Sequence, residues 1–204
     1  AIPYLIRTMR YYSPPHQAPF DCGSGRAVPD ALARIGEPAI KPLAEALADA
    51  EENIREGAKA ALVKMGRTAM DPMKRFLQFD TDPSIRRGAL DVLAEIKDDR
   101  IYETVTEALQ KNDMPHARGK AAEVLGRLND QRAVGPLMEA VRNRQEHWYV
   151  RYEATKALAA LRGKAFAMGV VESLGEGDDP EFLREIAYFR SENEPRKSAP
   201  EASR

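Results

Sequence analysis

IRRGALDVLAEI, residues 85–96, is the stretch of this sequence that decides the fold. Its pattern recurs as IREGAKAALVKM at 54–65, ARGKAAEVLGRL at 117–128 and VRYEATKALAAL at 150–161, and in shorter form from residue 183. The arginines stand at positions 55, 86, 118, 151 and 184, so successive copies are 31, 32, 33 and 33 residues apart. A period of this length predicts stacked supersecondary units that share one continuous core.

Each unit is predicted to contain two helices. Around every arginine the apolar positions are one residue before it and three, seven and ten residues after it, which is one face of a helix with 3.6 residues per turn. A second apolar segment precedes each of these helices, so we expect hairpins at 38–66, 69–97, 100–129, 133–162 and 165–190. Residues 1–10 and a helix at 28–36 complete a further hairpin. The prediction is an all-α fold of about six helical hairpins.

Prolines and aspartates indicate where these helices begin. Pro42, Pro72 and Pro136 are expected in the first turn of the leading helices, because a proline there loses no main-chain hydrogen bond. Asp82-Pro83 and Asp179-Pro180 are predicted to cap two of the second helices, since aspartate accepts a hydrogen bond from the free amides of a helix start.

The repeat pattern also defines the domain organisation. We expect one repeat domain over residues 1–190, interrupted by an insert loop at 11–25, where the periodicity is lost. Residues 191–204 are polar, contain proline and lack the period, which predicts a disordered tail.

The charge balance limits the possible partners. Lysine plus arginine number 31 and aspartate plus glutamate 32, so the net charge of −1 provides no general attraction for nucleic acid. No run of 18 apolar residues occurs, so membrane insertion is not expected. The one cysteine, Cys22, rules out an internal disulfide and fits a reducing compartment. Cytoplasmic localisation is therefore the default expectation, and export after removal of a signal peptide stays open because the sequence starts at Ala1.

With these copies in register, residues 1–10 and 26–190 resemble the HEAT-like repeat family, specifically the short repeats of phycobilisome-lyase type. The resemblance implies a right-handed α-solenoid with the second helices on its concave face. It also implies that each arginine pairs with a residue six positions earlier and so acts as a structural ladder between repeats. The implied pairs are Asp49–Arg55, Asp80–Arg86, Asn112–Arg118, Gln145–Arg151 and Asp178–Arg184.

Catalytic and metal sites are not expected. Deoxyhypusine hydroxylase, a HEAT-like protein, holds a di-iron centre with repeated His-Glu pairs. In this sequence none of the three histidines is followed by glutamate: His16, His116 and His147. His16 and Cys22 in the insert loop are too few ligands for a closed zinc site, and no base is positioned for thiol chemistry. Packing of the loop aromatics over the end of the solenoid is the preferred interpretation, and a partner-binding loop is the alternative.

An aromatic cluster and mixed charges are the candidates for partner binding. Trp148, Tyr149 and Tyr152 are residue types that anchor protein interfaces, although Trp148 could simply cap helix packing. Nearby solvent-side charges suit a polar rim and alternate in sign, which disfavours nucleic acid as the partner: Arg87, Asp91, Lys120, Glu123 and Lys156. The sequence thus predicts a non-catalytic scaffold that binds a protein or peptide on its concave surface, without a cofactor. An accessory component of a bilin (phycobiliprotein) lyase and a nucleic-acid-binding HEAT-like protein are the alternatives.

Overall fold

The computed structural model describes residues 1–11, 24–96, 98 and 100–191. Within them the chain forms six pairs of α-helices and no strand. The first helix of each pair, here called the A helix, is α1 (Ile2–Thr8), α3 (Glu37–Ala46), α5 (Arg67–Phe79), α7 (Ile101–Lys111), α9 (Val134–Arg142) or α11 (Lys164–Glu172). The second, the B helix, is α2 (Ser24–Ile35), α4 (Glu52–Met65), α6 (Pro83–Ile96), α8 (Pro115–Leu128), α10 (Trp148–Arg162) or α12 (Pro180–Ser191). Two short 3₁₀ helices, η1 (Met9–Tyr11) and η2 (Gln131–Ala133), complete the description.

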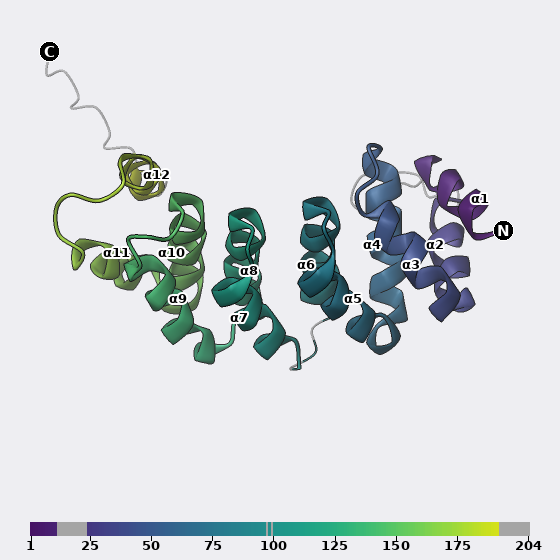
Figure 1. The fold of residues 1–204 in the computed structure, drawn as a ribbon, viewed down its shortest axis with the longest axis horizontal. Helices are drawn as coiled ribbons and strands as arrows, with labels where there is room; N and C mark the ends of the chain where they lie inside the picture. Colours follow the sequence, from purple (N-terminus) through teal and green to yellow (C-terminus); the bar gives the residue numbers. More distant parts are fainter. Residues whose placement is uncertain (12–23, 97, 99, 192–204) are drawn as a thin grey trace, which may run out of the picture.

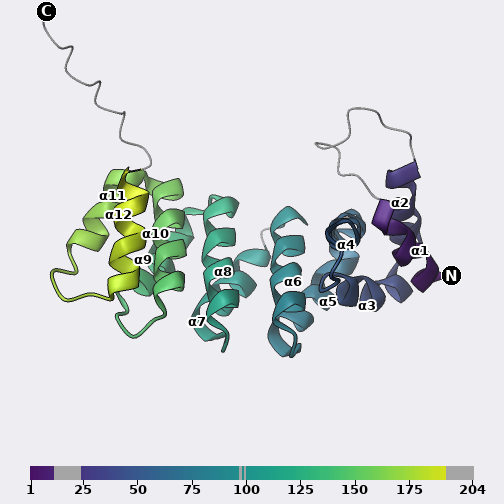
Figure 2. The same ribbon diagram turned by 90° about the horizontal axis from the view of Figure 1, so that it is seen from above.

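The helix pairs stack into an open arc, as Figure 1 shows. The B helices α4, α6, α8 and α10 form one row, and the A helices α3, α5, α7 and α9 form a second row beside it. The ends of the arc bend towards the B row, so the B helices line its inner side; Figure 2 gives the view from above. The predicted all-α solenoid of six helical hairpins is confirmed.

One continuous apolar core runs through the stack because the repeated small and apolar positions all point inward. The alanines three residues after the first four arginines and the leucines seven residues after them have no exposed surface: Ala58, Ala89, Ala121, Ala154, Leu62, Leu93, Leu125 and Leu158. Ala187, the corresponding alanine of α12, is exposed, since α12 is the last described helix of the stack.

The reversals from a B helix to the next A helix use left-handed backbone. Gly66 between α4 and α5 has φ +55°, and Asn129 between α8 and η2 has φ +54°. Glycine and asparagine tolerate this conformation better than other residues, which is why these two types end the helices.

The caps were predicted correctly and two of the prolines were not. Asp82 Oδ1 accepts from the Ser84 amide at 2.7 Å and Asp179 Oδ1 from the Glu181 amide at 2.8 Å, so α6 and α12 start at their prolines. Pro136 lies in the first turn of α9 as expected. Pro42 and Pro72, however, lie in helix interiors, because α3 and α5 already begin directly after Gly36 and Gly66. The residue that reverses the chain, and not the proline, sets these helix starts.

Close helix–helix packing depends on glycines of the B helices. A Cβ atom on Gly126 of α8 would lie 2.9 Å from Cα of Ala157 in α10. Gly88 of α6 faces Leu47 and Gly119 of α8 faces the ring of Tyr149 in the same manner. These contacts fix the spacing between consecutive hairpins.

Parts of the insert and tail predictions fall outside the described residues. Of the predicted insert at 11–25, Tyr11 ends η1 and residues 24–25 begin α2, which starts earlier than the predicted position 28. His16 and Cys22 lie outside the described residues, and so does the predicted tail apart from Ser191, the last residue of α12.

Candidate functional site

Three of the ladder arginines, Arg55, Arg86 and Arg118, bind the main chain of the turn that precedes their own helix. Arg55 Nη1 donates to the carbonyl oxygens of Asp49 and Ala50, each at 2.8 Å. Arg118 Nη1 donates to the carbonyl oxygen of Asn112 at 2.6 Å. The expected pairing with the side chain six positions earlier is therefore wrong at these positions, where the acceptor on that residue is its carbonyl oxygen. A backbone acceptor is available whatever side chain is present, which explains why the residue type at this position varies.

Three of the side chains six positions before the arginines accept hydrogen bonds from nearby backbone amides. Oδ1 of Asp49, Asp80 and Asn112 each accepts from the backbone amide two residues later, at distances of 2.8 to 3.1 Å. Such side-chain-to-backbone bonds fold the A-to-B turn and free the carbonyl oxygen for the guanidinium.

The charge of each central arginine is paired with the next hairpin. Arg118 donates from Nε and Nη2 to both carboxylate oxygens of Glu146, at 2.9 and 2.6 Å. Arg151 makes the same two-pronged contact with Asp178, and its Nε donates to the carbonyl oxygen of Val141 at 3.0 Å. The bonds to Glu146 and Asp178 join consecutive hairpins, and bidentate arginine–carboxylate pairs are among the strongest hydrogen-bonded pairs in proteins.

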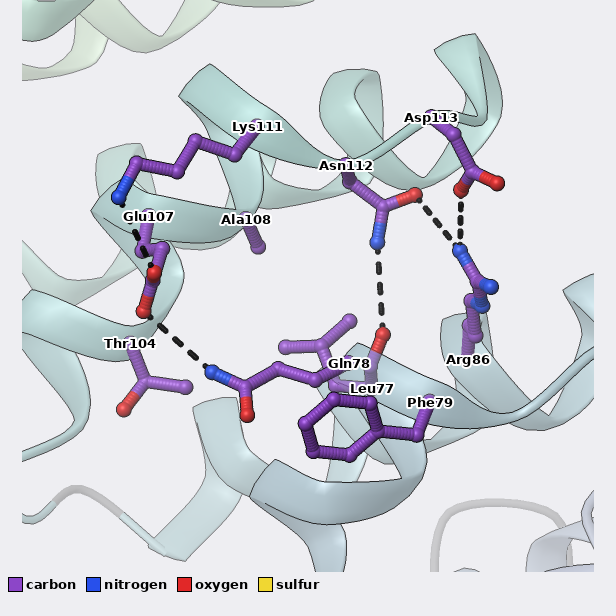
Figure 3. A pocket seen from close by; sticks show the side chains of 10 residues that line it. All are labelled: Leu77, Gln78, Phe79, Arg86, Thr104, Glu107, Ala108, Lys111, Asn112 and Asp113. Atoms are coloured by element: carbon purple, nitrogen blue, oxygen red, sulfur yellow. Dashed lines mark hydrogen bonds and ion pairs between the residues drawn. The ribbon is translucent and has the colours of Figure 1, made fainter.

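Arg86 makes the corresponding contact with a pair of acceptors. Its Nη1 donates to Asn112 Oδ1 at 3.2 Å and to Asp113 Oδ1 (Figure 3). Its Nε donates to the Asp80 carbonyl oxygen. The hydrogen bond from Arg86 lowers the pKa of Asp113, as the bond from Arg151 lowers the pKa of Asp178.

Two expected pairs are replaced by different contacts. Gln145 is exposed, and Asp178, the expected partner of Arg184, binds Arg151 instead. Arg184 pairs with Glu181 of its own helix at 2.8 Å, and both side chains are exposed. The sequence contained a partial signal for the true acceptors. An acidic residue follows four of the arginines after 27 or 28 residues, and three of these residues are the acceptors: Asp113, Glu146 and Asp178. The fourth, Asp82, follows Arg55 and caps α6 instead.

The eight residues predicted to bind a partner form one connected surface, here called the B-helix patch: Arg87, Asp91, Lys120, Glu123, Trp148, Tyr149, Tyr152 and Lys156. They lie on α6, α8 and α10 of the inner row. Lys120 Nζ lies 2.8 Å from Asp91 Oδ1 and 2.8 Å from Glu123 Oε2, which links α6 to α8. Arg87 shares with Asp91 and Lys120 the lining of a shallow hollow of about 240 Å³.

The aromatic part of the patch continues from α8 onto α10. Tyr149 packs on Gly119 and lies 5.3 Å from the ring of His116, and Trp148 meets Tyr149 edge to face at 5.9 Å. The ring centre of Tyr152 lies 6.4 Å from that of Phe189 in α12, and Lys156 Nζ lies 5.1 Å from the ring centre of Tyr152. Trp148 and Tyr152 are half-buried against the core, so they contribute to helix packing as well as to the surface.

Electrostatics hold the patch lysines in their charged form. Burial alone would lower the pKa of Lys120, but hydrogen bonds and charge interactions with Asp91 and Glu123 outweigh it and raise the pKa. Burial raises the pKa of the Tyr149 hydroxyl, and the nearby carboxylates of Glu153 and Glu123 raise it further. At neutral pH the patch therefore presents Lys120 paired with carboxylates beside the neutral hydroxyl of Tyr149.

Glu153 also belongs to this surface, although it was not among the residues predicted to bind a partner. Its side chain is buried on α10 and accepts two hydrogen bonds from Lys156 at 3.1 Å. An equivalent pair occurs on α4, where Lys59 Nζ lies 2.8 Å from Glu56 and 3.4 Å from Glu95 of α6. Pairs three residues apart on a helix are readable from sequence, whereas the burial of Glu153 depends on how α10 packs.

Comparison with known proteins identifies the family. A model of HEAT repeats matches this chain three times, over residues 40–115, 70–159 and 103–189. The chain belongs to the HEAT-repeat family. No curated protein matches the sequence significantly.

Three solved structures similar to this chain have low sequence identity to it and TM-scores below 0.5. Human deoxyhypusine hydroxylase in complex with glycerol is 19% identical with a TM-score of 0.48, and the match covers 95% of this chain and 74% of that chain. A designed armadillo repeat protein is 16% identical with a TM-score of 0.37, covering 95% and 94% of the two chains. The complex of CpcE and CpcF of phycocyanin lyase from Nostoc sp. PCC7120 is 20% identical with a TM-score of 0.31, covering 94% and 98%.

The described part of the HEAT solenoid contains neither a metal-binding cluster nor a membrane-spanning helix. Within the described residues, no group of three or more histidine, cysteine, aspartate or glutamate side chains is arranged to hold a metal ion. His147 caps α10, its Nδ1 accepting from the Tyr149 amide at 3.2 Å, and His116 packs on Tyr149. In the same part of the chain, every helix is too short or too polar to cross a bilayer.

Proposed function

We propose that this chain is a non-catalytic scaffold that binds a protein or peptide partner on its inner surface, at the B-helix patch. The observation that carries the proposal is the continuity of the patch, in which half-buried aromatic rings and ion-paired side chains connect α6, α8 and α10. Tryptophan, tyrosine and arginine contribute most of the binding energy at protein interfaces, and a polar border surrounds such anchors.

The pairing of the lysines favours a protein over a nucleic acid. Lys59, Lys120 and Lys156 each lie within 3.4 Å of a carboxylate. A lysine that already has a carboxylate partner gains little from a phosphate, because its counterion is part of the protein and is not released on binding. Paired charges of both signs instead suit a partner surface with its own alternating charges.

Site-specific photo-crosslinking in the source organism tests the proposal. A benzophenone amino acid replaces Arg87, an exposed residue of the patch, and the control carries it at Lys41, an exposed residue of the outer helix α3. We expect a defined protein adduct from position 87 and none from position 41. Identical adducts from both positions, or adducts from position 41 alone, would contradict the proposal.

The identity of the crosslinked molecule separates the alternatives. A phycobiliprotein subunit joined to position 87 would favour the accessory role in a bilin lyase, and nuclease-sensitive adducts would favour nucleic acid. Charge reversal then measures the contribution of the patch: Arg87→Glu should weaken binding of the captured partner, whereas Lys41→Glu should leave it unchanged. Equal affinity of the two variants would place the interface elsewhere.

A further inference from the structure

A groove between two A helices, distinct from the B-helix patch, is open to a ligand. It lies where α5 and α7 end and has a volume of about 470 Å³ (Figure 3). Leu77 and Ala108 line its interior, and Phe79 forms one wall. Glu107 and Asp113 stand on opposite sides of the opening.

The side chain of Phe79 is largely open to solvent, with 76% of its surface exposed. Elsewhere in the described chain a cation often covers an aromatic face, as Arg151 does over Phe182 at 4.0 Å and Arg132 over Tyr102 at 4.2 Å. Within that same part of the chain, no lysine or arginine lies over the ring of Phe79 in this way. The exposed ring therefore offers a face on which a cation from another molecule can stack.

The groove also has a negative electrostatic bias. The charges of Arg86 and Lys111 balance those of Asp113 and Glu107. Both α5 and α7 end here, and the carboxyl end of a helix carries a partial negative charge. The last turn of α5 contains no basic residue to offset this partial charge. Arg86 is buried and donates to Asp80, Asn112 and Asp113, so its donors already have acceptors inside the protein.

Glu107 is the carboxylate of this groove that already binds a cation, the ammonium group of Lys111. Lys111 Nζ lies 3.3 Å from Glu107 Oε1, and Gln78 Nε2 lies 3.3 Å from Glu107 Oε2. Both bonds are long, and all three side chains are exposed. Glu107 can therefore exchange these donors for stronger ones at little cost.

We propose that the groove binds the guanidinium of an arginine from a partner polypeptide. The planar group stacks on Phe79 and donates to Glu107, which a guanidinium does with two parallel bonds. Lys111 competes with the ligand for that carboxylate. The site lies outside the B-helix patch and does not depend on it, so the two surfaces can be tested separately.

The probe is the capped tripeptide acetyl-Gly-Arg-Gly-amide, titrated into the full chain while amide resonances are followed by NMR. We expect saturable shifts around Phe79 and Ala108. The same peptide with citrulline, which has the shape of arginine without its charge, should produce none. Equal binding of the citrulline peptide, tighter binding of acetyl-Gly-Leu-Gly-amide, or no saturable shift at tens of millimolar peptide would each overturn the proposal.

Variants of exposed residues test the individual contacts. Phe79→Leu should weaken binding about three- to tenfold, the range expected for loss of one cation–π contact. Glu107→Gln should weaken it at least as much, and Lys111→Gln should strengthen it by removing the competing cation. Tyr4→Leu changes an equally exposed ring on α1 and should have no effect. Unchanged affinity in both Phe79→Leu and Glu107→Gln would overturn the assignment, and so would weaker binding in Lys111→Gln.

Discussion

Arg151 donates to a carboxylate of the next hairpin from a position with 0% exposure, and its partner Asp178 is 3% exposed. Arg184, at the same point of the repeat pattern, is 69% exposed and binds within its own helix. A buried ion pair depends on both partners, because a single buried charge is costly, whereas an exposed pair contributes little. The same residue type therefore has two different energetic roles, set by whether its ion pair is buried.

This difference yields a prediction for single-residue replacements. Arg151→Ala should reduce the free energy of unfolding by about 3–5 kcal/mol, because the carboxylate of Asp178 stays buried without its partner. Arg184→Ala is the matched control and should change it by less than about 0.5 kcal/mol. Urea unfolding followed by circular dichroism measures both. If Arg151→Ala were as stable as wild type, the buried arginines would not act as struts between repeats.

A second residue-scale prediction concerns acid. The hydrogen bond from Arg151 lowers the pKa of Asp178 below its value in the unfolded chain. The ionised carboxylate therefore stabilises the fold at every pH above the unfolded pKa, near 4, and this contribution is lost as the pH falls through the lower folded pKa. Asp178→Asn removes that titration.

The measurement is the unfolding free energy between pH 7 and pH 2. The Asn variant should be less stable than wild type at pH 7, and the difference should shrink as the pH falls below about 4. A difference between the two proteins that stayed constant over this range would contradict the assigned role of Asp178.

At the scale of elements, the distance between B helices depends on missing side chains. A Cβ atom on Gly126 of α8 would lie 2.9 Å from Cα of Ala157 in α10, and backbone cannot move aside as a flexible side chain can. Gly169 of α11 also lies inside a helix, but a Cβ atom there would meet nothing within 4 Å. The two glycines have the same intrinsic effect on helix stability and opposite packing environments.

Alanine replacements separate these two effects. Gly169→Ala should stabilise the protein by about 0.5–1 kcal/mol, the difference in helix propensity between glycine and alanine. Gly126→Ala gains the same term but forces α8 and α10 apart, which costs about 1–3 kcal/mol, so its melting temperature should fall. Thermal unfolding of both variants provides the check, and a higher melting temperature for Gly126→Ala would show that the α8–α10 contact adapts easily.

At the scale of the whole molecule, the main packing contacts between the described helices lie within one hairpin or between consecutive hairpins. Stability in such a stack is approximately a sum of local terms. α1 contains no buried residue, whereas α10 buries eight. We therefore expect α1 to open before α10, rather than the whole stack to open as one unit.

Hydrogen exchange followed by mass spectrometry tests this prediction. Amides of α8 and α10 should be protected the longest and those of α1 the least. In Arg151→Ala the loss of protection should centre on α10 and α12 and leave α4 nearly unchanged. Uniform loss along the chain would indicate a single cooperative unit instead of a nearest-neighbour stack.

Most of the fold was predictable from local sequence, and part of the arginine geometry was not. The apolar positions and the aspartate caps depend on residues within one or two helical turns, and the repeat shows the same pattern several times. These features could therefore be read directly from the sequence. The predicted starts of α3 and α5 were too late, because Pro42 and Pro72 were expected in the first turn. The helices instead begin directly after the reversals at Gly36 and Gly66. The B-helix patch came together as its residues suggested, although the burial of Glu153 was unexpected.

The sequence by itself determined the all-α solenoid, its six hairpins and its core positions, since helical periodicity is a property of neighbouring residues. Only the tertiary structure decided which acceptor each arginine binds, for example that Asp178 pairs with Arg151 and not with Arg184. It also decided that the exposed ring of Phe79 lines the same groove as Glu107 and Asp113. The physical reason is that hydrogen bonds and burial between hairpins join residues about 30 positions apart. Their partners are fixed by how closely the helices pack, and no local pattern encodes that distance.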